Sequence, residues 1–152
     1  MRAIALALLV VVSACGGATQ GEGGTVVEEG RVSAFEVEVG DCFNDPEDLS
    51  AVVDVEAVPC QQAHDNEIFA LPQYPAGPEE AYPGDEEVDS FAEQACLEAF
   101  AGYVGIPYED SVFIYGTISP RAETWADGDR EVICILYDPD QKLEGSMQGS
   151  RR

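Results

Sequence analysis

The sequence predicts an α+β domain in which a mostly antiparallel sheet of about five strands packs on one long helix, with two disulfides. Three observations lead to this prediction. Short stretches of alternating apolar and polar residues, typical of half-buried strands, lie on both sides of one segment with helical periodicity. That segment comprises residues 85–105. Four of the five cysteines lie among these elements, an even number that suits two disulfide bonds.

Three strands are expected before the long helix. Apolar and polar side chains alternate in each, and a glycine or a proline ends each pattern, since proline cannot donate a ladder hydrogen bond. In the first strand the alternating apolar residues are Phe35, Val37 and Val39. The three segments are residues 31–43, 51–60 and 66–74.

The long helix is predicted from apolar residues that recur every three or four positions. Acidic residues fill its first turn, where the helix dipole favours them, and Asp85 can cap the start. Gly105 weakens the end. Cys96 lies on the apolar stripe. Residues 75–85, which precede the helix, are rich in proline and glycine and are predicted to form a loop.

Two more strands and a short helix are expected after the long helix. Residues 110–119 read as a strand. Ser119 as N-cap and Pro120 at the first helical position then predict a short helix. Residues 130–138 form the last predicted strand. Three residues share its apolar face: Val132, Cys134 and Leu136.

The N-terminus has the features of a lipoprotein signal peptide. Residues 1–14 combine a positive start, an apolar run of about ten residues and small residues, and are too short to span a bilayer as a mature helix. The ending "VSAC" resembles a bacterial lipobox, which predicts that Cys15 carries a lipid anchor. The alternative is an ordinary secretory signal that is cleaved at a nearby alanine.

Composition divides the rest of the chain into three parts. Residues 15–30 are glycine-rich and acidic and are expected to form a flexible tether. Residues 31–142 hold the predicted α+β domain. Residues 143–152 form a polar tail that is expected to fray.

The four cysteines left after Cys15 are Cys42, Cys60, Cys96 and Cys134. In an exported protein an even set is typical of disulfides, and four cysteines allow three pairings. We favour the pairing of neighbours, Cys42 with Cys60 and Cys96 with Cys134. The second pair joins two apolar faces, one on the long helix and one on the last strand.

The charge of the chain excludes some classes of partner. It has 30 Asp plus Glu against 7 Lys plus Arg, a net charge of -23. This balance disfavours nucleic acid, whose phosphates are bound by Lys and Arg, and it repels an anionic lipid surface. A strongly solvated surface explains the acidity; a cationic partner or a loose divalent-ion surface is the alternative.

The stretch "VPCQQAHDNEIFA" (residues 58–70) contains the only histidine, His64, among a cysteine and two acids. No serine or free thiol marks a nucleophile for it, so we expect no catalytic residue and no enzyme. A disulfide at Cys60 would also remove that sulfur as a zinc ligand, so we expect no metal and no cofactor. The structural interpretation is that the imidazole bonds a backbone carbonyl or a carboxylate near the turn.

Four residues are candidates for binding: His64, Trp125, Tyr74 and Tyr82. Trp125, the only tryptophan, is otherwise a packing anchor of the short helix. Tyr74 precedes the proline-rich loop and Tyr82 lies within it; the loop is either an exposed contact segment or a plain solvated loop.

The order of several motifs resembles the actinobacterial septum formation family. These motifs are "GDCF" (residues 40–43), "VPCQQAHDNEIFA", "YPGD" (residues 82–85) and "WADGDREVICILYDPDQKLEGSMQG" (residues 125–149). The resemblance covers about residues 40–149. It implies an exported or membrane-tethered domain with a role in septum formation and envelope processes, and it brings no catalytic residue. The family's recurrent positions match Cys42, Cys60, His64, Cys96, Trp125 and Cys134.

The expected function is a lipid-anchored interaction domain on the outer face of the cytoplasmic membrane. Its partner would be an envelope or division protein. One alternative is an extracytoplasmic sensor lipoprotein that binds a metal or a small ligand at His64. The weakest alternative is a cell-wall-acting enzyme, which would require His64, Asp65 and Glu67 to converge in a pocket.

Overall fold

The computed structural model describes residues 19–20, 26–33, 36–45 and 54–152. The predicted signal peptide and Cys15 lie outside these residues. No helix within the described ranges is long and apolar enough to cross a bilayer.

The core of the molecule is a six-stranded antiparallel sheet with the strand order β3-β5-β4-β6-β8-β7. The α+β class and the mostly antiparallel sheet are therefore confirmed, with one strand more than the expected five or so. The strands are β3 (Gly30–Ser33), β4 (Cys42–Asn44), β5 (Asp54–Val58), β6 (Asn66–Ala70), β7 (Ile114–Ile118) and β8 (Ile133–Tyr137).

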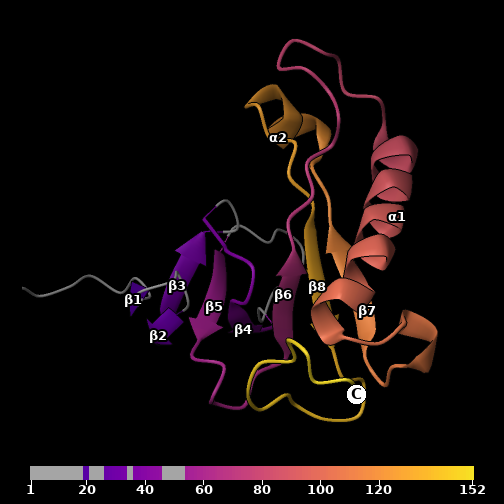
Figure 1. Cartoon of the computed structure of the whole chain (residues 1–152). Helices are drawn as coiled ribbons and strands as arrows, with labels where there is room; N and C mark the ends of the chain where they lie inside the picture. Colours follow the sequence, from indigo (N-terminus) through magenta and orange to yellow (C-terminus); the bar gives the residue numbers. More distant parts are fainter. Residues whose placement is uncertain (1–18, 21–25, 34–35, 46–53) are drawn as a thin grey trace, which may run out of the picture.

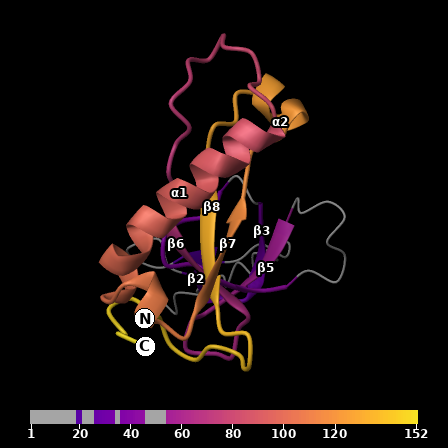
Figure 2. The ribbon, with the colours of Figure 1, turned by 90° about the vertical axis from the view of Figure 1, so that its right-hand side faces the viewer.

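One long helix, α1 (Asp85–Val104), lies across one face of the sheet and contacts β6 and β7 (Figures 1 and 2). Its buried residues recur at helical spacing, as predicted, and its first turn is acidic. Gly105 ends the helix with a φ of 90°, a left-handed conformation that favours glycine. The N-cap is Gly84 and Asp85 is the first helical residue, so the expected Asp85 cap is wrong by one position.

Apolar side chains form two clusters, one on each face of the sheet. The larger cluster lies between α1 and the sheet and includes the predicted face of β8. The smaller one includes Val37 and Phe43, together with Ile133 from the opposite face of β8. Alternation along β8 therefore supplies both clusters. The three residues of the predicted face are fully buried: Val132, Cys134 and Leu136.

Both disulfides join the predicted partners. Cys42 in β4 pairs with Cys60, which follows β5, and their Cα atoms are 5.2 Å apart. Cys96 in α1 pairs with Cys134 in β8 at a Cα separation of 5.5 Å. The first bond therefore fixes the central strands to the turn before β6, and the second fixes the helix to the sheet.

The first predicted strand differs from the structure. Residues 36–41 are not a strand, although Val37 and Val39 alternate with acids. Gly40 has a φ of 96° and its N–H bonds the Ile68 carbonyl at 2.7 Å, which turns the chain into β4. Val37 is buried in the smaller cluster from this irregular segment. Alternation therefore identified a half-buried segment but not its backbone conformation.

The expected flexible tether also differs where it is described. Thr19–Gln20 (β1) and Val26–Glu28 (β2) pair as a small antiparallel sheet, and β3 already begins at Gly30. Threonine and valine are β-branched, which favours strand over irregular chain. The rest of this segment lies outside the described residues.

Two short helices complete the fold. One is a 3₁₀ turn, η1 (Tyr108–Asp110), and the other is α2 (Ala122–Ala126). The N-cap of α2 is Arg121 rather than the expected Ser119. Thr124 supplies the side-chain acceptor for the Arg121 N–H at 3.1 Å, which explains the shift of the start.

The C-terminal segment, residues 143–152, does not fray, so that expectation is wrong. Leu143 and Met147 are 2% and 3% exposed and belong to the larger cluster. The backbones of His64 and Leu143 exchange two hydrogen bonds, at 3.1 and 2.8 Å. These two apolar side chains bury the segment in the cluster that α1 and β8 also form. The polar composition of the segment gave no indication of this packing.

Candidate functional site

His64 lies in the turn between β5 and β6, and its side chain is fully buried. Its Nδ1 is 2.8 Å from the backbone carbonyl of Gln62, the kind of bond that the sequence predicted. Because a carbonyl only accepts, Nδ1 carries a proton, and in the neutral imidazole Nε2 then keeps its lone pair. Nε2 is buried and has no hydrogen-bond partner among the described groups.

Glu67 on β6 is a fully buried carboxylate that accepts three hydrogen bonds. Oε1 accepts from the Tyr103 hydroxyl at 2.6 Å and from Ser146 Oγ at 2.5 Å. Oε2 accepts from the backbone N–H of Met147 at 2.6 Å. Three donors compensate the buried charge, and they come from α1 and the C-terminal segment. Burial, reinforced by Glu67, raises the pKa of Tyr103 well above its usual value, so this hydroxyl stays a donor.

Donor atoms of Cys42, His64 and Glu67 all lie within 4.8 Å of one another. We call these residues, together with Cys60, the Cys–His–Glu cluster. In the oxidised domain both sulfurs belong to the disulfide and supply no thiolate. Only the imidazole and the carboxylate then carry free lone pairs for a ligand.

Asp65 is separate from this cluster. Its carboxylate lies 2.8 Å from Lys142 Nζ and accepts from the Asp45 N–H at 3.1 Å. The three residues that a wall-acting enzyme would need therefore do not converge, because His64 and Glu67 are interior and Asp65 is in an ion pair. The described arrangement gives such an enzyme no accessible histidine base.

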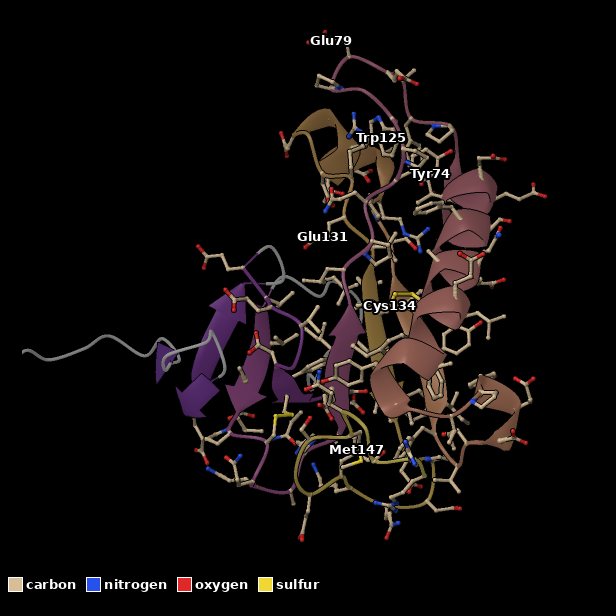
Figure 3. All side chains as sticks on the ribbon, in the orientation of Figure 1. Tyr74, Glu79, Trp125, Glu131, Cys134 and Met147 are labelled. Atoms are coloured by element: carbon tan, nitrogen blue, oxygen red, sulfur yellow. A yellow bond between two sulfur atoms is a disulfide. The ribbon has the colours of Figure 1, made fainter. Side chains whose placement is uncertain are left out.

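A second group of residues lies at the other end of the molecule, around Trp125 (Figure 3). Trp125 is only 4% exposed, as expected of a packing anchor, and its role in binding stays a prediction. Its Nε1–H donates to the Glu80 carbonyl at 2.8 Å. The rings of Tyr74 and Tyr82 both meet it edge-on at 5.4 Å.

Arg130 completes this group, and sequence reasoning missed it. Its guanidinium lies 3.6 Å from the centre of the Trp125 ring. It also donates to the Trp125 carbonyl at 2.9 Å and to the loop carbonyls of Gly77 and Pro78 at 3.4 Å. The one signal in the sequence was a cation inside a run of acids, and that pattern alone does not predict burial. Five residues form this group, which we call the aromatic platform: Tyr74, Tyr82, Phe91, Trp125 and Arg130.

The aromatic platform holds the proline-rich loop, residues 75–84, by its backbone. The Glu80 side chain adds a bond to the Gly77 N–H at 2.8 Å, which closes the tip. Figure 3 shows Glu79 at the tip, with Trp125 and Tyr74 beneath it. Six loop side chains are exposed while the backbone is fixed: Pro75, Pro78, Glu79, Glu80, Ala81 and Pro83. The loop is thus an ordered, solvent-facing surface.

The surroundings of this loop are acidic. Asp85 accepts from the Tyr82 hydroxyl at 2.5 Å, and burial together with this contact raises the pKa of Tyr82. Arg121 bridges Asp89 and Asp85 at 3.2 and 3.6 Å. Burial lowers the pKa of Arg121, but the two carboxylates outweigh it and raise the pKa. Further exposed acids are Glu79, Glu80, Glu86, Glu87, Glu123 and Asp127.

The comparisons with known proteins identify a family. The family model described as Septum formation matches residues 39–151, about three quarters of the chain. The match includes both disulfides, the Cys–His–Glu cluster, the aromatic platform and the C-terminal segment. No curated protein and no solved structure matches the chain. The chain belongs to the Septum formation family.

Proposed function

We propose that this protein is a lipid-anchored binding domain of an actinobacterial cell envelope that acts in septum formation or division. Cys15 would hold it at the outer face of the cytoplasmic membrane, and an envelope or division protein would be its partner. Three features support the proposal. The chain belongs to the Septum formation family, its first residues read as a lipoprotein signal, and two disulfides suit an oxidising compartment.

The single observation that carries the binding role is the fixed loop on the aromatic platform. Loops on a rigid scaffold commonly carry binding residues. Trp125 and Arg130 hold the loop backbone through three hydrogen bonds to its carbonyls, and a fourth bond joins Arg130 to the Trp125 carbonyl. A partner would therefore meet a surface that is already ordered, which lowers the entropic cost of association.

Charge suggests the chemistry of the partner. The loop and the helix starts beside it present exposed acids, within a chain of net charge -23. A basic surface on an envelope protein would complement this end, and complementary charge speeds association. The same charge keeps the domain off an anionic bilayer, so the lipid on Cys15 would be the membrane contact.

The sensor alternative has one observation in its favour. The buried Nε2 of His64 has no hydrogen-bond partner among the described groups, and a ring nitrogen of His64 lies within 4.8 Å of a Glu67 oxygen. In the oxidised domain these two residues offer only two ligand atoms, fewer than a zinc site normally uses. Binding through the loop is therefore the function that the geometry supports best.

The test uses the full lipid-anchored chain in its own envelope. A photo-crosslinking amino acid replaces Glu79 at the loop tip, and in a matched variant it replaces Glu144, which is exposed in the C-terminal segment. The Glu79 position should crosslink to an envelope or division protein identified by mass spectrometry, and the Glu144 position should not. Equal products from both positions, or none from Glu79, would contradict the proposal.

The anchor is tested separately. Mass spectrometry of the mature protein should find a diacylglyceryl group on Cys15, and Cys15→Ser should release the domain from the membrane fraction. A variant that stays with the membrane, or a mature N-terminus without lipid, would remove the anchor from the proposal while the crosslinking result stands on its own.

A further inference from the structure

Three side chains with the donor atoms that zinc prefers meet at one place in the interior, and a fourth is bonded to one of them. The sulfur of Cys42, a ring nitrogen of His64 and a carboxylate oxygen of Glu67 lie within 4.8 Å of one another. The sulfur of Cys60 is bonded to that of Cys42 and so lies beside the same cluster. Two sulfurs, one imidazole and one carboxylate make a four-ligand set for Zn²⁺.

His64 supplies a second and independent observation. A buried imidazole nitrogen without a hydrogen-bond partner lowers the stability of the fold, so such an atom indicates that a ligand could bind there. Here Nε2 is that atom, and the opposite nitrogen is fixed by the Gln62 carbonyl at 2.8 Å. Metal-binding histidines typically donate their other N–H to a carbonyl or a carboxylate in this way. The ring therefore already has the tautomer of a ligand.

Glu67 is oriented as well. Its Oε1 accepts two hydrogen bonds, from Tyr103 and Ser146, while its Oε2 accepts one, from the Met147 N–H. A carboxylate oxygen has two lone pairs, so Oε2 keeps one for a metal ion while the three donors hold the group in place. Hydrogen-bonded carboxylates of this kind are typical ligands.

The two disulfides differ in access to a reductant. Cys96 and Cys134 are both fully buried between α1 and β8. Cys60 is half-buried, and it precedes the exposed residues 61–63. A thiolate reductant attacks a sulfur that it can reach, so the Cys42–Cys60 bond would open while the other stays closed.

From these contacts we propose that the Cys–His–Glu cluster is a redox-gated Zn²⁺ site. A dithiol reductant transfers two electrons and two protons to the Cys42–Cys60 bond, which becomes two thiols while the dithiol becomes a disulfide. Zn²⁺ then displaces both thiol protons, forms two Zn–S bonds, and takes His64 Nε2 and a Glu67 oxygen as its other ligands. The ion, two thiolates and the carboxylate leave a net charge of -1.

Three of the four ligands in this cluster need only a small movement to reach zinc geometry. Ligands about 2.0–2.3 Å from a tetrahedral ion lie about 3.3–3.8 Å from one another. The donor atoms of Cys42, His64 and Glu67, which lie within 4.8 Å of one another in the oxidised form, therefore have to close by about 1 Å, while the bonded sulfur of Cys60 has to move away from that of Cys42. Opening the disulfide frees both sulfurs for this adjustment, while β4 and β6 remain paired through their backbone.

The experiment titrates Co²⁺, as a spectroscopic probe for Zn²⁺, into the full chain without oxygen. One sample is oxidised, and the other has been reduced with dithiothreitol and then desalted. Mass mapping of alkylated thiols verifies that Cys42 and Cys60 are free while Cys96 and Cys134 stay bonded to each other. The reduced chain should bind one Co²⁺ with sulfur-to-cobalt charge-transfer bands and the visible bands of a tetrahedral site. Its affinity should exceed that of the oxidised chain by about 100-fold or more.

Two variants test the assignment. Glu67→Gln should weaken binding by the reduced chain about 10–100-fold, while Glu79→Gln, an acid at the exposed loop tip, should leave it unchanged. If Glu67→Gln does not fold, the wild-type chain decides alone. Equal binding by oxidised and reduced chains, bands without sulfur character, or no binding to a reduced and folded chain would overturn the proposal.

Discussion

The backbone N–H of Met147 donates to the buried carboxylate of Glu67 at 2.6 Å, across 80 residues of sequence. The hydroxyls of Tyr103 and Ser146 bond the same carboxylate. This one acid therefore joins β6, α1 and the C-terminal segment, and residues that read as a polar tail become part of the core.

The first prediction concerns the charge of Glu67. In Glu67→Gln one oxygen becomes an amide NH₂ that faces donors, so at least one buried donor loses its acceptor. We expect a loss of about 2–4 kcal/mol in the free energy of unfolding, measured by urea titration. Glu144→Gln, an exposed acid of the same segment, is the control and should stay within about 0.5 kcal/mol. Equal midpoints for both variants would disprove this role of Glu67.

The second prediction concerns Met147, which is buried in the larger cluster (Figure 3). Met147→Ala should destabilise the domain by about 2–5 kcal/mol because it leaves a cavity. Hydrogen exchange should also speed up at the backbone N–H groups of His64 and Leu143, which bond each other's carbonyls. Gln148→Ala, at the exposed neighbouring position, should change neither quantity. Unchanged exchange in Met147→Ala would show that the segment is held by its polar contacts alone.

The third prediction concerns the hold on the proline-rich loop. Trp125→Phe keeps an aromatic ring between Tyr74 and Tyr82 but removes the indole N–H that bonds the Glu80 carbonyl. We expect a loss of about 0.5–1.5 kcal/mol in stability and faster proteolysis within residues 75–84. If partner binding uses the ordered loop, affinity should fall as well. A loop that stays equally resistant to protease would indicate that Arg130 alone holds it.

Sequence reasoning succeeded where the signal was local. The helix and the face of β8 follow from periodicity, and the pairing of Cys96 with Cys134 follows from the apolar faces on which both cysteines lie. The strand before Gly40 and the N-cap of α2 were wrong because contacts outside the pattern decide them, the hydrogen bond from Gly40 to Ile68 and the Thr124 side chain. Alternating apolar and polar residues indicate which side chains are buried. At Val37 the predicted burial is confirmed, but the predicted strand is wrong.

The candidate site was predicted only in part, for a different physical reason. His64 was singled out as the only histidine, and its backbone bond was expected. Glu67 entered only as one of three residues that a wall-acting enzyme would require, because nothing local shows that Tyr103 and Ser146 surround it. Arg130 was missed because a buried guanidinium is determined by the distant carbonyls that it satisfies. Long-range pairing of polar groups leaves no periodic pattern in a single sequence.

The fourth prediction uses the pKa of Glu131, which burial, and then the charge of Asp129, raises above the ordinary value of 4.5. The folded pKa exceeds the unfolded one, so the ionised carboxylate costs stability above the folded pKa, and this cost vanishes below the unfolded pKa. Glu131→Gln should therefore melt at a higher temperature than the wild type at pH 7. The side-chain carbonyl of this variant can still accept the hydrogen bond that Gln73 donates to Glu131 at 2.8 Å. A gain that persists below pH 4.5, or no gain at pH 7, would contradict this assignment.

The fifth prediction concerns the ion pair between Asp65 and Lys142, which fastens the C-terminal segment to the turn before β6. Burial raises the pKa of Asp65, but the Lys142 hydrogen bond, the Asp45 N–H and the Lys142 charge together lower it below 3.8. The contribution to stability is then present above the unfolded pKa and is lost as the pH falls through the folded one. Asp65→Asn should therefore destabilise the domain at pH 7 and match the wild type in strong acid.

Because both side chains are partly exposed, a double-mutant cycle with Lys142→Gln should give a coupling of about 0.2–1 kcal/mol that weakens with salt. Lys142 also donates a hydrogen bond to the Asn44 side chain at 2.8 Å. A coupling energy that does not change with pH or salt would show that Asp65 and Lys142 stabilise the domain through separate contacts such as this one.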